Sequence, residues 1–190
     1  MHITVIALSS FDGARVCGAW CVLRVPSCVA AVRSAWDLRA RTLQRTSAAF
    51  VSGPSCADEA AALYHHALEA SRRGPVLEIG SYCGKSTIYL ALASRQHNAT
   101  VFALDHHRGS EEHQFGEYFH DPDLYDAGEE LMDTFREFRR NIRQAGLDDT
   151  VVPVVAGSEA AANQWQTPLA MVFIDGGHSL DAALTDYRCW

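Results

Sequence analysis

Four short apolar runs recur in the second part of the chain. They cover residues 76–79, 100–104, 150–155 and 169–174. Each run is nearly continuous in apolar side chains, which is typical of strands buried on both faces of a sheet. We therefore predict four strands. Pro153 places the third of them at a sheet edge, because proline cannot donate a hydrogen bond to the ladder.

Segments with helical spacing of apolar side chains lie between and after these runs. The expected helices cover residues 57–71, 86–94, 129–145 and 180–190. The third is the clearest, because apolar side chains mark one face at steps of four, three and four. These side chains are Leu131, Phe135, Phe138 and Ile142. A glycine at position 146 then ends the pattern.

The alternation of strands and helices predicts an α/β fold, with a mostly parallel sheet and helices on both faces. Right-handed crossovers leave few topologies for such a sheet. Ligands bind these sheets beyond the carboxyl ends of the strands, near the point where the strand order reverses. In this chain those ends carry Gly80, Asp105, Ser158 and Asp175. Polar and acidic residues thus gather where the architecture places a ligand.

The first 52 residues differ from the rest in charge. Residues 1–52 contain six Arg and two Asp, a net charge of +4, whereas residues 53–190 contain ten basic and 21 acidic side chains, a net charge of −11. We divide the chain into a basic N-terminal extension, 1–52, and an α/β domain, 53–190. The extension offers a strand over 4–8 and an Arg-faced helix over 30–43. We interpret it as weakly ordered chain, or as a basic helix for a partner or an acidic surface.

The overall composition excludes several classes of protein. The net charge of −7 argues against a nucleic-acid-coating protein. No apolar run approaches the length of about 18 residues that a membrane-spanning helix needs. The six cysteines form no C-x-x-C pair, so we expect free thiols rather than a zinc site. The first residues lack the basic region of a secretory signal, and we predict a cytoplasmic protein.

The turn after the first strand of the α/β domain permits two interpretations. Gly84-Lys85-Ser86 matches the end of a phosphate-binding loop, and residues 172–175 could be the metal-binding strand of a nucleotide hydrolase. The spacing fails by one residue, however, because the position five before Gly84 is Ile79 rather than glycine. The shorter loop presents fewer backbone N–H groups to a phosphate. We keep the hydrolase as the weaker alternative.

The second interpretation is a nucleoside site. Glu78-x-Gly80-x-x-x-Gly84 at a strand-to-helix turn lets the backbone pass close to a ligand at two glycines. A further acid, Asp105, ends the next strand, 25 residues after Gly80. A carboxylate in that position can accept hydrogen bonds from both hydroxyls of a ribose.

This combination resembles the class I S-adenosylmethionine-dependent methyltransferases, over about residues 55–190. It is most similar to small-molecule O-methyltransferases with an Asp-Gly-x-His motif, here Asp175-Gly176-Gly177-His178. The resemblance implies a Rossmann-like fold, S-adenosylmethionine as cofactor and a small organic acceptor. It places the glycine loop at the methionine part of the cofactor, and His106 and Ser158 near the adenine. The residues implied to bind the cofactor are Glu78, Gly80, Ser81, Gly84, Asp105, His106, Ser158 and Asp175.

Methyl transfer requires mainly that the acceptor is placed in line with the methyl group. Asp175 is a candidate ligand for Mg²⁺, and His178 is a candidate catalytic base. Each residue also has a plainer interpretation, since Asp175 could cap the following turn and His178 could order its loop. We interpret the long polar stretch over 106–128 as a lid over the acceptor rather than a metal site.

The resemblance also implies strands that this chain does not supply. By this resemblance such domains build a sheet of about seven strands, of which four are predicted here. The last predicted strand would then have an unpaired flank, which invites aggregation or pairing. We therefore expect a C-terminally truncated domain in which a second copy or another partner covers this flank. The alternative is a non-catalytic Rossmann-like remnant or interaction module.

Overall fold

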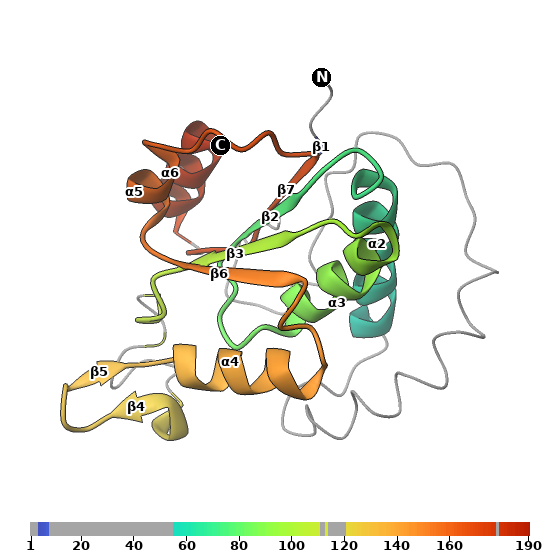
Figure 1. Cartoon of the computed structure of the whole chain (residues 1–190). Coiled ribbons are helices and arrows are strands. Elements are labelled where there is room, and N and C mark those ends of the chain that lie inside the picture. The colour runs from blue at the N-terminus through green and yellow to red at the C-terminus, as the bar shows by residue number, and fades with distance from the viewer. Residues whose placement is uncertain (1–3, 8–54, 111–112, 114–120, 178) are drawn as a thin grey trace.

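A five-stranded parallel sheet forms the centre of the protein (Figure 1). The structure is a computed structural model, and it describes residues 4–7, 55–110, 113, 121–177 and 179–190. The strands lie in the order β1-β7-β2-β3-β6. Their bounds are Thr4–Ala7 for β1, Val76–Ile79 for β2, Val101–Asp105 for β3, Val151–Val155 for β6 and Met171–Ile174 for β7. The predicted α/β fold with a mostly parallel sheet is confirmed.

Helices cover both faces of this sheet (Figure 1). Three of them, α2, α3 and α4, pack on one face, and α5 and α6 lie over the other. Their bounds are Ser55–Ala70 for α2, Lys85–Ser94 for α3, Phe135–Gln144 for α4, Ser158–Ala162 for α5 and Leu180–Cys189 for α6. None of the described helices combines the length and the apolarity that crossing a bilayer requires.

Alternate residues of each strand supply the two halves of the core, as the period of two in a strand requires. Val76 and Phe173 face the helices α2, α3 and α4, whereas Leu77 and Val172 face α5 and the end of α6. All four side chains are at most 1% exposed. The acid Glu78 therefore shares the face of Val76, and it is directed toward α3 rather than toward solvent.

The start of the third helix was predicted wrongly. α4 begins at Phe135, because the residues before it form a small hairpin between β4, Tyr125–Asp126, and β5, Leu131–Met132. The Asp126 carboxylate accepts hydrogen bonds from the N–H groups of residues 128 and 129, at 2.8 and 3.2 Å, and closes the hairpin turn. The apolar positions before Phe135 thus serve a hairpin. The helix α5 was not predicted, since five residues are too few to establish a period.

The two edge strands of the sheet, β1 and β6, test two of the sequence predictions. β6, which contains Pro153, lies at one edge, as expected. The expected unpaired flank of the last strand is wrong, because β1 pairs with β7 in parallel, from Thr4 beside Met171 to Ala7 beside Ile174. The chain's own N-terminal strand therefore covers the flank for which we expected a partner or a second copy.

The division into residues 1–52 and 53–190 stays a prediction, because residues 8–54 lie outside the described part of the chain. The expected helix over 30–43 lies in the same range. β1 nevertheless shows that four residues of the N-terminal extension join the sheet of the α/β domain.

Candidate functional site

The glycine loop between β2 and α3 lies at the carboxyl ends of the strands. Gly80 and Gly84 both have left-handed backbones, with φ of +87° and +86°. A Cβ atom on Gly80 would overlap the carbonyl oxygen of Asp175, and one on Gly84 would lie 3.1 Å from the Phe138 ring. We expected these glycines to admit a ligand. The structure shows that contacts within the protein already require both of them.

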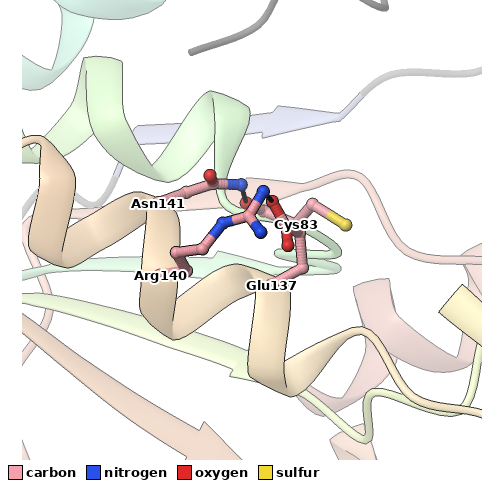
Figure 2. Close-up of polar contacts among 4 residues, drawn as sticks. All are labelled: Cys83, Glu137, Arg140 and Asn141. Atoms are coloured by element: carbon pink, nitrogen blue, oxygen red, sulfur yellow. Dashed lines mark hydrogen bonds and ion pairs between the residues drawn. The ribbon is translucent and has the colours of Figure 1, made fainter. Parts of the chain in front are cut away.

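The helix α4 lies beside this loop and contacts it through Asn141 (Figure 2). The Asn141 side-chain amide donates a hydrogen bond of 2.9 Å to the carbonyl oxygen of Cys83. Glu137, one turn earlier, pairs with Arg140 at 2.6 Å (Figure 2). Burial raises the pKa of the Cys83 thiol to about 12, and the nearby carboxylate of Glu137 adds to the rise. Cys83 is therefore a neutral thiol at physiological pH.

Asp105 ties the end of β3 to the glycine loop. Its Oδ2 accepts a hydrogen bond of 2.7 Å from the Tyr82 N–H, and its Oδ1 accepts one of 2.7 Å from the His107 N–H. The side chain is only partly buried. A carboxylate offers about four lone-pair directions. Asp105 can therefore keep both backbone contacts and still accept hydrogen bonds from a ligand.

Glu78 is a buried acid without a complete set of partners. It is 0% exposed, and the Thr87 hydroxyl donates to its Oε2. Its Oε1 has no hydrogen-bond partner among the residues that the structure describes. Burial raises its pKa to about 8. The hydroxyls of Ser86 and Thr87 oppose this rise, and the carboxylates of Asp175 and Asp105 reinforce it. Glu78 is therefore mainly protonated at neutral pH.

The three acids singled out in the sequence lie together at the carboxyl ends of neighbouring strands. Glu78 lies one residue before the end of β2, Asp105 ends β3, and Asp175 follows directly after β7. The N–H of Asp175 donates a hydrogen bond of 2.8 Å to the Ile79 carbonyl, next to the glycine loop. Ser81, in that loop, is 1% exposed, and its hydroxyl has no hydrogen-bond partner in the described part of the chain. Among the described residues, β2 and the glycine loop thus carry two buried polar atoms without a hydrogen-bond partner.

Two further predicted residues lie beside this group. Ser158 begins α5, and its hydroxyl accepts a hydrogen bond of 2.8 Å from the Trp190 indole. His106 is exposed after β3, and its Nδ1 accepts a hydrogen bond of 3.1 Å from the Arg108 N–H. Asp186 interacts with both residues. Burial raises the pKa of its carboxyl group, whereas the hydrogen bond with Ser158 and the charge of His106 oppose this rise. His178, the candidate base, lies outside the described residues.

The predicted lid begins as a packed turn. Within the described part of 106–128, the His113 ring stacks on Tyr82 with centroids 5.0 Å apart. The residue that sequence reasoning missed is His107, which is 2% exposed although its neighbour His106 is exposed. Two adjacent histidines in a polar stretch gave no signal that one of them would be buried.

The described residues contain no group of three or more His, Cys, Asp or Glu side chains that could hold a metal ion. Mg²⁺ therefore finds no support in this part of the chain. The assignment of Asp175 as a metal ligand stays a prediction.

Three solved structures resemble the fold over most of this chain. The methyltransferase PaMTH1 from Podospora anserina, bound to SAH, is 15% identical, and the match covers 80% of this chain and 56% of that one with a TM-score of 0.52. Cofactor-bound Rv0187 from MTB is 21% identical, with 80% and 60% covered and a TM-score of 0.48. An O-methyltransferase from Bacillus cereus in complex with SAH is 23% identical, with 72% and 53% covered and a TM-score of 0.44.

This chain thus spans little more than half the length of these proteins. PaMTH1 supports the Rossmann-like fold, which the glycine loop and the acidic strand ends had predicted. A family model described as a methyltransferase domain matches residues 77–190, which include the glycine loop, Asp105 and Asp175. Since this match covers more than half of the sequence, the chain belongs to the methyltransferase domain family.

Proposed function

We propose that this chain binds S-adenosylmethionine at the carboxyl ends of β2, β3 and β7 and takes part in methyl transfer to a small organic acceptor. The observation that carries the proposal is the Asp105 carboxylate, which two backbone N–H groups fix against the glycine loop. Two of the solved structures that resemble the chain, PaMTH1 and the Bacillus cereus O-methyltransferase, hold SAH, the demethylated form of this cofactor.

The residues at this edge fit the chemistry of the cofactor. S-adenosylmethionine carries ribose hydroxyls, which donate hydrogen bonds, and a positively charged sulfonium and ammonium group. Asp105 offers acceptor oxygens to the ribose. Glu78 Oε1 and the Ser81 hydroxyl are buried and find no hydrogen-bond partner among the described residues. Such groups are costly unless a ligand or another group satisfies them. A cationic ligand at this edge also meets the carboxylates of Asp105 and Asp175.

Catalysis in this proposal is mainly placement. When bound, the cofactor supplies a methyl group that its sulfonium already activates. The glycine loop and Asp105 hold the cofactor so that its methyl group can lie in line with the acceptor. The Asp-Gly-x-His motif, which begins at Asp175 and ends at the candidate base His178, makes O-methylation the preferred chemistry. A cytoplasmic location is part of the proposal, and Mg²⁺ is not.

Isothermal titration of the full chain with S-adenosylmethionine and with S-adenosylhomocysteine tests this proposal. We expect the wild-type chain to bind both, and Asp105→Asn to bind at least about tenfold more weakly, because hydrogen bonds to a charged acceptor are lost. Asp148→Asn is the matched control, because Asp148 is exposed in the turn before β6. A folded wild-type sample that binds neither ligand overturns the proposal and favours a non-catalytic remnant.

A further inference from the structure

His107 is a buried titratable residue that the proposed chemistry does not use. It lies two residues beyond β3 and is 2% exposed. Its backbone is left-handed, with φ of +59°. In this conformation the His107 N–H donates to Asp105 Oδ1 at 2.7 Å, and the His107 carbonyl accepts from the Thr134 N–H at 3.2 Å. The backbone of one residue thus connects Asp105 to the start of α4.

The side chain of His107 also contacts the start of α4. Its Nδ1 lies 2.8 Å from the Thr134 hydroxyl oxygen. Its ring packs on Phe135 and Phe138, with centroids 4.9 and 5.3 Å away. Phe138 is also the side chain that lies under Gly84. The His107 ring therefore fills the space between the turn after β3, the start of α4 and the glycine loop.

These side-chain contacts stabilise an unfavourable backbone. A left-handed conformation costs an L-residue about 1–2 kcal/mol, although His, Asn and Asp adopt it more often than others do. Burial lowers the pKa of His107, while the charges of Asp105 and Asp133 oppose the shift and that of His106 adds to it. The ring is therefore neutral at pH 7. It contacts Thr134, the two Phe rings and the backbone of Tyr82 in the glycine loop. Without these contacts the turn would relax, and the N–H would leave Asp105.

We infer that His107 is a positioning residue, which locks the turn after β3 onto α4 and thereby orients the Asp105 carboxylate for the ribose of the cofactor. The role in binding rests on the proposed function. The orientation of Asp105 itself is a property of the free protein, and it can be tested without any ligand.

The binding test compares two variants of His107 that differ in their tolerance of a left-handed backbone and in their side-chain polarity. Asn tolerates the left-handed backbone and places a polar atom near the position of Nδ1, whereas Leu does neither. We expect His107→Leu to bind S-adenosylhomocysteine at least about tenfold more weakly, and His107→Asn to recover most of this loss. Leu147→Ala serves as a control for lost stability, because Leu147 is 0% exposed and belongs to the core on the face of α2, α3 and α4. Thr134→Val removes the hydroxyl partner and provides a milder variant should His107→Leu fail to fold.

Amide hydrogen exchange in the ligand-free protein gives the second readout. The Tyr82 N–H donates a hydrogen bond to the other oxygen of Asp105. If the carboxylate rotates away, this N–H loses its acceptor and exchanges faster with solvent. We expect Tyr82 to exchange at least about tenfold faster in His107→Leu or Thr134→Val than in Leu147→Ala of similar global stability. Equal exchange of Tyr82 in these variants, or an equal loss of affinity in Leu147→Ala, overturns the inference. A wild-type chain that does not bind S-adenosylhomocysteine overturns the proposed function, and the exchange of Tyr82 then decides on His107 alone.

Discussion

At the scale of single residues, two acids at the carboxyl ends of β2 and β3 differ in how many hydrogen bonds the protein donates to them. Asp105 accepts two backbone hydrogen bonds and remains partly open to solvent. Glu78 is fully buried, and only one of its oxygens has a partner. An acid in the second situation holds its proton more tightly in the folded state than in the unfolded one. Glu78 therefore makes the stability of the protein depend on pH.

The direction of this dependence follows from the two pKa values. The unfolded chain releases the Glu78 proton near the ordinary pKa of 4.5, and the folded protein releases it near 8. Between these values the unfolded state binds fewer protons, so the contribution of Glu78 falls by up to about 1.4 kcal/mol per pH unit as pH rises. Glu78→Gln removes the ionisation. Urea unfolding should show the variant gaining stability over wild type from pH 4.5 to 8. A difference that is constant across this range would contradict the account, and Asp148→Asn controls for general charge effects.

The glycines allow a second test at the same scale. Gly80→Ala places a Cβ against the carbonyl of Asp175, whereas Gly146→Ala has the same left-handed requirement and no atom within 4 Å. We expect Gly146→Ala to lose about 1–2 kcal/mol of stability from the backbone alone. Gly80→Ala should lose about 4 kcal/mol or more, because backbone atoms must move as well. Urea midpoints of the two variants measure this difference, and equal losses would show that the close approach of β2 and β7 is not as described.

At the scale of elements, α4 is the part that holds the glycine loop. Asn141 reaches the Cys83 carbonyl, and Phe138 and Ile142 lie beneath Gly84. We expect Asn141→Ala to lose about 1 kcal/mol of stability and to bind S-adenosylhomocysteine about threefold or more weakly. Gln144→Ala, on the exposed end of the same helix, should change neither quantity. Equal affinities of the two variants would show that α4 does not support the site.

The apolar pattern predicted these elements unequally. The central strands and the glycine loop were predictable, because buried parallel strands have continuous apolar runs and the turn has two glycines at a fixed spacing. The start of α4 was not, since Leu131 suits both a helix face and the hairpin in which it lies. The buried environment of His107 was not predictable either, because it depends on Phe135 and Phe138, which are far from it in sequence.

At the scale of the whole molecule, the N-terminal strand changes the interpretation of the sheet. The sequence predicted an unpaired flank on the last strand, and β1 covers this flank in parallel. Pattern alone could not reveal this, because four apolar residues at the start of a chain have no periodicity that specifies a partner.

Removing this strand should expose the edge of β7. We expect a chain lacking residues 1–8 to be less stable in urea and to self-associate as its concentration rises, because a free strand edge pairs with other chains. Light scattering coupled to size-exclusion chromatography measures the association. A truncated chain that is as stable as the full chain and does not associate would contradict the assigned role of β1.

The proposed cofactor site lies at the carboxyl ends of β2 and β3. Its most direct test is a titration of the isotope-labelled full chain with S-adenosylhomocysteine, followed through backbone amide chemical shifts. We expect the largest changes at Ser81, Tyr82 and His107. Little change is expected at Gly74, Asn98 and Asp148, which lie at the amino ends of the strands. Changes confined to the amino ends, or none at a saturating concentration, would contradict this assignment.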